Sequence, residues 1–343
     1  MKAVSSISTE VELEDRLSEP TPAVVETLGR LQGDLLLLGV AGKMGPTLAR
    51  MAKRASDVAD VRRRVIGVAR FSSGGREALE SHGVETIPCD LLDEGEVAKL
   101  PDAANVVFMA GMKFGATGNE STTWAMNSYL PGIVCRKYGR SRIVAFSTGN
   151  VYGLAPVEVG GSREGDVPQP VGEYAMSCLG RERVFEYFSR KLGIPMAIIR
   201  LNYACEMRYG VLVDIARRVW NGESIELGMG YFNTIWQGDA NAMTLRAFDW
   251  LATPPWVVNM SGPERLSIRA VGEQFGRLYG KPARFTGTES TTAFLSNARA
   301  GLERLGAPRL PVSRLIEWVA DWVAGGGKLL GKPTHFESRD GRY

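Results

Sequence analysis

Runs of consecutive apolar residues alternate with amphipathic stretches over roughly the first two hundred residues. Unbroken apolar runs predict strands that are buried on both faces, as in a parallel sheet covered by helices. We predict such strands at 34–38, 65–69, 85–89, 106–109, 143–146 and 196–201. Helical periodicity between them predicts helices at 43–55, 75–82, 94–99, 121–138 and 172–192. This alternation predicts an α/β fold with a doubly wound parallel sheet.

Beyond about residue 202 the pattern changes, and helices dominate. We predict these helices near 209–221, 267–279, 294–305 and 312–324. The whole pattern divides the chain into an N-terminal extension (1–32), a sheet domain (33–201, with strands returning from about 233–260), a smaller C-terminal α/β substrate domain (202–324) and a C-terminal tail (325–343). The tail lacks apolar periodicity, so we expect either an extended arm or a disordered end.

Composition narrows the function classes. The 41 basic and 38 acidic side chains give a net charge of +3, which argues against nucleic-acid and membrane-surface partners. Acidic residues near the N-terminus argue against a signal peptide, and the apolar runs are too short to span a bilayer. The four cysteines are dispersed, which indicates reduced thiols and a cytoplasmic protein. No spacing of histidine, cysteine and carboxylate residues indicates a metal site.

A glycine pattern follows the first predicted strand directly. The segment is Gly39-Val-Ala-Gly42-Lys43-Met44-Gly45, and a helical stretch comes next. Gly39 permits a tight turn, Gly42 lets the backbone approach a diphosphate, and Gly45 lets the helix pack closely on the strand. The N-terminus of that helix offers N–H groups and partial positive charge to phosphates. The pattern predicts an NAD(P) site in a Rossmann-type domain; the alternative is a purely structural turn.

The end of the second strand bears on the choice of dinucleotide. NAD sites usually place an acid there for the ribose hydroxyls, whereas this chain has Ala69 followed by Arg70. Arginine binds a 2′-phosphate in a bidentate manner. Together with Lys43 this favours NADP over NAD, unless Arg70 is only a surface charge.

Further cofactor contacts are predicted where the next two strands end. Asp90 and Leu91 close the third strand, where an acid can meet the adenine amino group. Ala110 and Gly111 follow the fourth strand and let the backbone lie against the cofactor, while Lys113 can reach a phosphate or ribose. The alternatives are that Asp90 caps the following helix and that Lys113 is a solvated loop charge.

These motifs together resemble the extended short-chain dehydrogenase/reductases, in the NAD-dependent epimerase/dehydratase family. The residues that carry the resemblance are Gly39-x-x-Gly42-x-x-Gly45, Asp90-Leu91, Ala110-Gly111, Ser147-Thr148 before Val151-Tyr152-Gly153, and Tyr174. The resemblance covers about residues 33–260. It implies hydride transfer on a sugar, sugar acid or sugar nucleotide, and a homodimer. The stretch 110–113 is similar to a loop of UDP-galactose 4-epimerases whose lysine contacts the cofactor.

The resemblance also implies catalytic roles. Tyr174 is the proton shuttle, and Thr148 hydrogen-bonds the same substrate oxygen. The family pattern Tyr-x-x-x-Lys is broken here, because Cys178 stands at the lysine position. A lysine there would lower the tyrosine pKa from about 10 toward neutrality, which a neutral cysteine does not do. Either Arg181 or Lys113 substitutes for it, or catalysis is impaired and the chain is a dinucleotide-binding sensor or interaction protein.

Other polar residues are assigned to the site through the resemblance and their position. Asn127 matches an asparagine that braces the active-site backbone. We predict substrate contacts from residues beside the active-site threonine, just past the sixth strand and in the smaller domain: Ser147, Asn202, Tyr203, Arg208 and Trp236. The segment Trp236-Gln-Gly-Asp239 is similar to the family's His-x-x-Asp segment. For Arg208, Trp236 and Asp239, ordinary packing of the smaller domain is the alternative.

Overall fold

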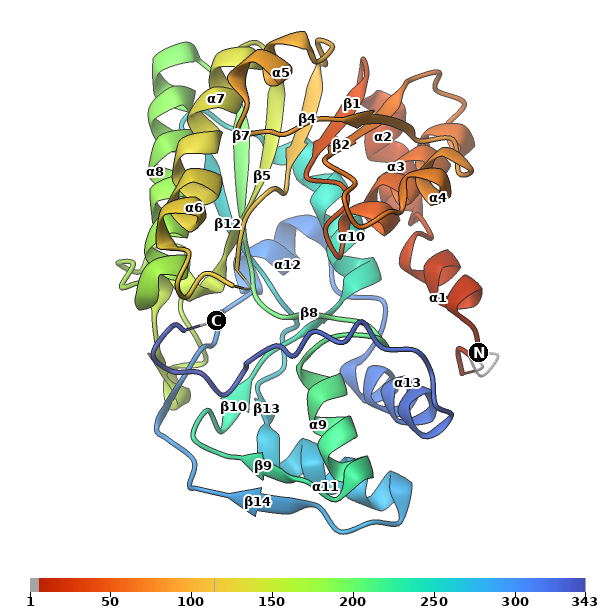
Figure 1. Cartoon of the computed structure of the whole chain (residues 1–343), viewed down its shortest axis with the longest axis vertical. Coiled ribbons are helices and arrows are strands. Elements are labelled where there is room, and N and C mark those ends of the chain that lie inside the picture. The colour runs from red at the N-terminus through yellow and green to blue at the C-terminus, as the bar shows by residue number, and fades with distance from the viewer. Residues whose placement is uncertain (1–5, 114, 343) are drawn as a thin grey trace.

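A seven-stranded parallel sheet organises the larger part of the molecule (Figure 1). The computed structural model describes residues 6–113 and 115–342. The strands lie in the order β12-β7-β5-β4-β1-β2-β3. Their bounds are β1 Leu35–Leu38, β2 Val65–Ala69, β3 Glu85–Pro88, β4 Asn105–Phe108, β5 Arg142–Thr148, β7 Met196–Leu201 and β12 Trp256–Met260. The prediction of a doubly wound parallel sheet is confirmed, and β12 extends its edge beside β7.

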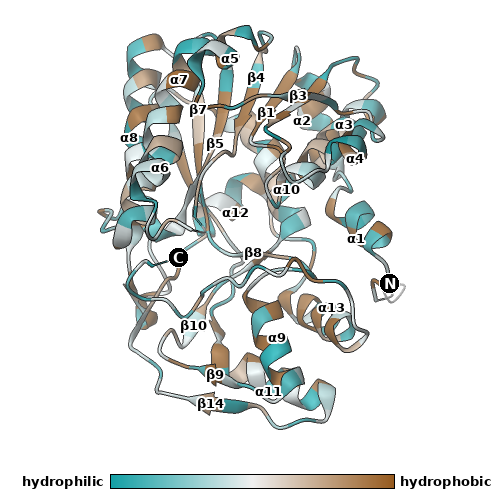
Figure 2. Ribbon diagram, in the orientation of Figure 1, coloured by the Kyte–Doolittle hydropathy of each residue, from teal (hydrophilic) through white to brown (hydrophobic). Residues whose placement is uncertain are grey.

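Helices cover both faces of this sheet, as the apolar strands require. Along β1, Leu35 and Leu37 face one core while Leu36 and Leu38 face the other, because side chains alternate along a strand. Figure 2 shows the apolar strands enclosed between helices whose outer faces are polar. The helices of this layer are α3 Gly45–Val58, α4 Arg76–Glu80, α5 Glu94–Lys99, α6 Glu120–Trp124, α7 Leu130–Lys137, α8 Gly172–Leu192 and α10 Gln237–Arg246.

The predicted helix 121–138 contains a π-helical turn. This turn, η1 Ala125–Tyr129, joins α6 to α7, and Leu130 N–H bonds to the carbonyl of Ala125. Pro131 follows at the start of α7 and has no N–H to give to the carbonyl four residues earlier, that of Asn127. The wide turn thus coincides with a position where the regular helix pattern cannot continue.

A smaller domain with its own core lies below the carboxyl ends of the strands in Figure 1. Its helices are α9 Val211–Asn221, α11 Ile268–Tyr279 and α13 Val312–Ala324. Short strands complete it: β8 Ala204–Cys205, β9 Ser224–Glu226, β10 Tyr231–Phe232, β11 Ile235–Trp236, β13 Leu266–Ser267 and β14 Arg284–Thr286. The remaining short elements are β6 Ala155–Pro156, β15 Thr292–Ala293, α12 Arg299–Leu305, η2 Gly149–Tyr152, η3 Val157–Val159 and η4 Ala247–Trp250.

The helix predicted at 294–305 is shorter than expected. It begins only at Arg299, because the backbone before it is paired elsewhere. Ser296 N–H donates to Asn233 Oδ1, and Asn297 N–H donates to the carbonyl of Ser162. These bonds fix the backbone of residues 296 and 297 to Asn233 and Ser162 in a non-helical conformation.

The N-terminal extension joins the two cores. It forms α1 Glu10–Leu17 and α2 Pro22–Arg30, each capped by a threonine at its N-terminus. Leu13 and Leu17 of α1 are buried in the core of the smaller domain, whereas Leu28 of α2 is buried against the sheet. The extension is therefore part of the folded body over its described residues.

The C-terminal tail is a packed arm, which settles the alternative left open by the sequence. Phe336 is only 1% exposed, and the Arg218 guanidinium lies 5.5 Å from its ring centroid. Thr334 donates through its N–H and its hydroxyl to Asp214 Oδ2. Gly341 ends against the backbone of Gly172, at the start of α8 (Figure 1). A single buried aromatic side chain carries no periodicity, so the sequence pattern missed this docking.

Replacing the buried ring of the tail is expected to lower stability. Phe336→Leu should reduce the free energy of unfolding by about 1 kcal/mol, because a smaller side chain leaves the site imperfectly filled. Urea denaturation measures this loss. The matched control is Leu330→Ala in the same arm, where Leu330 is 37% exposed and a change within about 0.5 kcal/mol is expected. Equal effects of both substitutions would contradict docking through Phe336.

Residues 6–113 and 115–342 contain neither a helix suited to cross a membrane nor a cluster of metal ligands. None of the helices in that part of the chain has the length and apolar character needed to cross a bilayer. Within the same residues no three histidine, cysteine or acidic side chains gather as metal ligands would. The four cysteines are buried free thiols, as their spacing predicted.

Candidate active site

The three glycines of the turn differ in what surrounds them. A Cβ on Gly39, whose φ is +89°, would lie 2.7 Å from the backbone of Ala110, and a Cβ on Gly45 would overlap the carbonyl of Val40. Gly42 is exposed, and the nearest atom to a Cβ there is Gly39 O at 3.4 Å. Packing therefore explains two of the glycines, while Gly42 leaves bare backbone open beside the N-terminus of α3.

Two lysines stand beside this open turn. Lys43 Nζ donates to the carbonyl of Ala204 at 2.7 Å and lies 3.9 Å from the ring centroid of Tyr209. Lys113 Nζ lies 5.7 Å from the ring centroid of Tyr174. The pKa of each lysine is lowered to about 8, mainly by burial, and the charge of Lys43 contributes to the lowering for Lys113. Desolvated cations beside bare backbone and a helix N-terminus fit the diphosphate of a dinucleotide.

Arg70, Asp90 and Leu91 were predicted to lie near the adenosine part of the dinucleotide. Arg70 is exposed at the end of β2. Asp90 Oδ1 accepts a hydrogen bond from Leu92 N–H at 3.0 Å, and Leu91 is buried. The helix that follows is capped by Asp93 rather than Asp90. Lys43, which supported the NADP preference, directs its ammonium to the smaller domain instead of toward Arg70.

Tyr174 and Thr148 meet at the carboxyl edge of the sheet. Thr148 is the last residue of β5, and Tyr174 is the third residue of α8. The phenol of Tyr174 is hydrogen-bonded to Thr148, and its pKa is raised well above 10 mainly because the group is desolvated. The charge of Arg181 acts in the opposite direction and favours the phenolate. The structure thus brings together the pair that the sequence placed 26 residues apart.

Cys178 lies on the same face of α8 and is fully buried. It is hydrogen-bonded to Tyr174, and desolvation raises the pKa of its thiol. A neutral buried thiol supplies neither a positive charge nor a reactive thiolate. Cys178 is therefore a packing neighbour of the phenol.

Arg181 and Asn127 hold the backbone behind the tyrosine. Asn127 accepts from Met112 N–H and donates to Met112 O, both at 3.0 Å, and it also donates to Ser177 Oγ at 2.9 Å. Arg181 donates to Asn127 Oδ1, to Asn127 O at 3.3 Å and to Phe146 O at 2.9 Å. A Cβ on Gly111 would collide with this guanidinium. Gly111 thus makes room for Arg181.

Ser147 has a different partner from the predicted substrate. Its hydroxyl donates to Glu182 Oε1 at 2.5 Å, and Glu182 forms a buried ion pair with Arg200 at 2.6 Å. Side chains alternate along β5, so Ser147 and Thr148 point to opposite faces of the sheet. Glu182 and Arg200 were not among the residues predicted from the sequence. The available signal was an arginine inside the apolar strand MAIIRL, because a buried arginine requires a partner.

Just past β7, Asn202 and Tyr203 lie at the predicted edge of the sheet. Asn202 is buried and donates to Asn233 Oδ1 at 2.7 Å, and a Cβ on Gly149 would lie 3.3 Å from it. Tyr203 has a φ of +45°, and its carbonyl accepts from Ile235 N–H. Both residues join β7 to the smaller domain beside Thr148.

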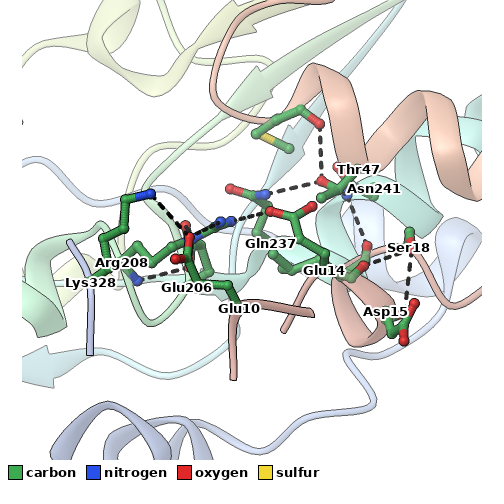
Figure 3. A network of polar contacts seen from close by, with 12 residues as sticks. Glu10, Glu14, Asp15, Ser18, Thr47, Glu206, Arg208, Gln237, Asn241 and Lys328 are labelled. Carbon is green, nitrogen blue, oxygen red and sulfur yellow. Dashed lines mark hydrogen bonds and ion pairs between the residues drawn. The ribbon is translucent and has the colours of Figure 1, made fainter. Parts of the chain in front are cut away.

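Arg208 and Trp236, both predicted as substrate contacts, have partners within the protein. Figure 3 shows Arg208 among Glu10, Glu14 and the buried Glu206, which ties the N-terminal helix to the smaller domain. Trp236 packs edge-on against Trp318, with ring centroids 5.9 Å apart. Asp239, in the same segment, pairs with Arg309. Packing of the smaller domain, the alternative that the sequence left open, accounts for all three residues.

Comparisons with known proteins agree with this geometry. A model of the NAD dependent epimerase/dehydratase family matches residues 35–205, and a search of curated protein sequences gives no match. Among solved structures, MoeE5 in complex with UDP-glucose and NAD has a TM-score of 0.70 and 19% identity, over 86% of this chain and 99% of that one. UDP-glucose 4-epimerase from Thermotoga maritima, with UDP-glucose, has a TM-score of 0.71 and 17% identity, over 86% and 99%.

A third solved structure is UDP-glucuronic acid 4-epimerase from Bacillus cereus in complex with UDP-glucuronic acid and NAD. Its TM-score is 0.71 and its identity 18%, over 85% of this chain and 99% of that one. At these identities the likeness establishes a shared fold. The match over 35–205, which includes the glycine turn, Thr148 and Tyr174, shows that this chain belongs to the NAD dependent epimerase/dehydratase family.

Proposed function

We propose that this protein is an NAD(H)-dependent enzyme that oxidises and reduces a hydroxyl-bearing carbon of a sugar nucleotide, most simply as an epimerase. The observation that carries the proposal is the hydrogen-bonded pair of Thr148 and Tyr174, at the carboxyl edge of the sheet and on the same edge as the open glycine turn. Ligands of doubly wound folds bind at that edge. The matched fold in three structures with sugar nucleotides supports the substrate class.

Each residue of the pair has a defined chemical task. Thr148 Oγ1 hydrogen-bonds the substrate hydroxyl and holds it against the phenol. Tyr174 Oη receives the hydroxyl proton when the carbon is oxidised and returns it when the carbon is reduced. A bound nicotinamide supplies the acceptance and return of hydride. In an epimerisation the substrate leaves with the same oxidation state, so no external oxidant is needed.

The turn and the residues beside it would hold the cofactor. Backbone at Gly42 and the N-terminus of α3 would face its diphosphate, and Lys43 and Lys113 would add positive charge. We propose NAD rather than the NADP favoured by the sequence pattern, because Lys43 is bound to Ala204 and two of the structures compared contain NAD. Tighter binding of NADP than NAD, lost in Arg70→Ala, would reverse this choice.

Cofactor affinity is expected to depend on pH through the two lysines. Both have pKa values lowered to about 8, so their charges are present below pH 8 and are lost above it. An anionic diphosphate binds the charged forms better. The dissociation constant for NADH should therefore rise about tenfold between pH 7.5 and 9.5. Fluorescence titration measures it, and Lys43→Gln with Lys113→Gln should flatten the dependence.

A control for this pH effect is Lys191→Gln, which removes an exposed lysine of α8 and should leave the dependence intact. A dissociation constant that stays constant across the interval in the wild-type protein would contradict the assignment of both lysines to the diphosphate.

The function is tested by incubating the protein with UDP-glucose, UDP-galactose and UDP-glucuronic acid and separating the epimers by chromatography. Epimer formation in the wild-type protein and none in Tyr174→Phe is the expected result. Tight NAD(H) binding with no turnover of any sugar nucleotide would instead favour the catalytically impaired dinucleotide-binding sensor or interaction protein, which the loss of the family lysine at Cys178 makes a specific alternative.

We also propose that the protein forms a homodimer through the helices of one face. Large apolar side chains are exposed on α6, η1 and α8, namely Trp124, Tyr129, Met176 and Tyr187. Exposed apolar clusters mark protein–protein contacts. Light scattering tests this, and a monomer at micromolar concentration would contradict it.

A further inference from the structure

A positive charge from a position other than the usual one acts on the tyrosine of the site. Cys178, four residues after Tyr174, stands where the family pattern has lysine, and it is neutral. Arg181 follows three residues later on the same face of α8, because seven residues make about two helical turns. Its charge lowers the pKa of Tyr174. The positive charge therefore comes from Arg181, about one helical turn after Cys178 in α8.

The guanidinium of Arg181 sits in a pocket that several residues shape for it. Pro131 lacks an N–H, which leaves the carbonyl of Asn127 without its helical donor, and Arg181 Nε donates to that carbonyl at 3.3 Å. Phe146 O, from β5, accepts from Nη1 at 2.9 Å. Any side chain at Gly111 would collide with Nη2. The guanidinium of Arg181 is therefore positioned by three features: the carbonyl that Pro131 leaves free, the carbonyl of Phe146, and the space left by the absent side chain of Gly111.

Arg181 differs from the neighbouring charged side chains in its hydrogen-bond partners. Arg181 is 6% exposed, and within residues 6–113 and 115–342 its hydrogen bonds go to carbonyl and amide oxygens rather than to a carboxylate. The nearby acid on α8, Glu182, pairs with Arg200 instead. A buried guanidinium whose charge is not cancelled by a carboxylate projects its field on the groups around it, and the desolvated phenol of Tyr174 is one of them.

We propose that Arg181 replaces the missing lysine as the fixed charge that favours the phenolate of Tyr174, and that Lys113 assists from the loop beyond β4. Arg181 lies on the same helix as Tyr174, whereas Lys113 Nζ lies 5.7 Å from the ring centroid of Tyr174. Arg181 is a positioning residue, since it acts through Tyr174. The proposal rests on the proposed function, in which Tyr174 transfers the proton.

Several charged or titratable groups act on the phenol, and a titration of variants separates their effects. Cys178 and Arg181 lie on α8, Thr148 ends β5, and Lys113 lies on the loop after β4. Trifluorotyrosine placed at position 174 has a phenol acidic enough to titrate while the protein stays folded. Its ¹⁹F chemical shift reports the ionisation without cofactor or substrate.

Arg181→Gln is expected to raise the ionisation midpoint of residue 174 by about one to two pH units, because a buried positive charge that favours the phenolate is lost. Arg181→Lys, which keeps a positive charge, should restore at least half of that shift. Lys113→Met should raise the midpoint by a smaller amount. The matched control is Arg183→Gln, whose side chain is exposed on α8, and it should change nothing.

The proposal is overturned if Arg181→Gln leaves the midpoint unchanged, or if Arg181→Lys and Arg181→Gln raise it equally. Should Arg181→Gln fail to fold, the size of the Lys113→Met effect decides. A rise of a full pH unit or more in Lys113→Met would show that Lys113 sets the midpoint and would overturn the proposal, whereas a smaller rise supports it. Failure of the proposed function gives a different result, namely a wild-type protein that binds no NAD(H) whatever its tyrosine titration.

Discussion

Tyr174→Phe is expected to lower the turnover of a sugar nucleotide by about 10²–10⁴-fold, the usual contribution of a positioned general acid–base group. The substitution removes only the phenolic oxygen. Thr148 and the aromatic ring of residue 174 remain, so the contact between the Lys113 ammonium and this ring is preserved. NADH affinity should stay within about twofold of wild type, because the glycine turn is untouched. Single-turnover kinetics with separated epimers measures the first quantity, and fluorescence titration measures the second.

The control for this substitution is Tyr187→Phe on the same helix. Tyr187 is 54% exposed and contacts Lys191 on the surface, so turnover should remain at the wild-type rate. Turnover in Tyr174→Phe within about threefold of wild type would remove the tyrosine from the proton-transfer step.

Gly42→Val is expected to weaken NADH binding by at least about a hundredfold, equal to about 2.7 kcal/mol. The side chain would project from the open backbone where the diphosphate must approach. Gly42 does not have a positive φ, and its surroundings are open, so unfolding free energy should change by less than about 0.5 kcal/mol. Calorimetric titration and urea denaturation give the two numbers.

Gly45→Ala provides the contrast within the same turn. Its Cβ would overlap the carbonyl of Val40, so the protein should lose about 1–3 kcal/mol of stability. A protein in which Gly42→Val binds NADH as tightly as wild type would show that the turn is only structural.

The sheet was predictable because burial on both faces leaves strands without polar positions. The bounds of β2 and β7, and those of α8, agree with the predicted segments 65–69, 196–201 and 172–192. The pairing of Thr148 with Tyr174 was also accessible, since strand ends and helix starts of this fold meet at one edge. These features depend on local pattern and on the topology that follows from it.

Other features depend on contacts between distant segments. Arg208 was assigned to substrate, yet its partners Glu10 and Glu14 lie almost two hundred residues earlier in α1. The docking of the tail depends on one aromatic residue, Phe336. A charged or aromatic residue alone does not reveal its partner, so no pattern in the sequence could identify these contacts.

The surroundings of Arg181 could be predicted only in part from the sequence. From the sequence, Arg181 and Lys113 were both candidates to replace the missing lysine, and nothing in the sequence favoured one over the other. What distinguishes Arg181 is the convergence of Pro131 and Gly111 on its guanidinium, which only the structure brings together. An asparagine followed four residues later by proline inside a helix was the local signal for the freed carbonyl.

The central claim is that the turn from Gly39 to Gly45 binds the diphosphate of NAD(H) beside Tyr174. Isothermal calorimetry on protein first stripped of carried-over ligand tests it most directly, with NAD and NADH titrated separately. We expect saturable binding at one site per chain. Absence of binding for both the oxidised and the reduced dinucleotide would contradict it.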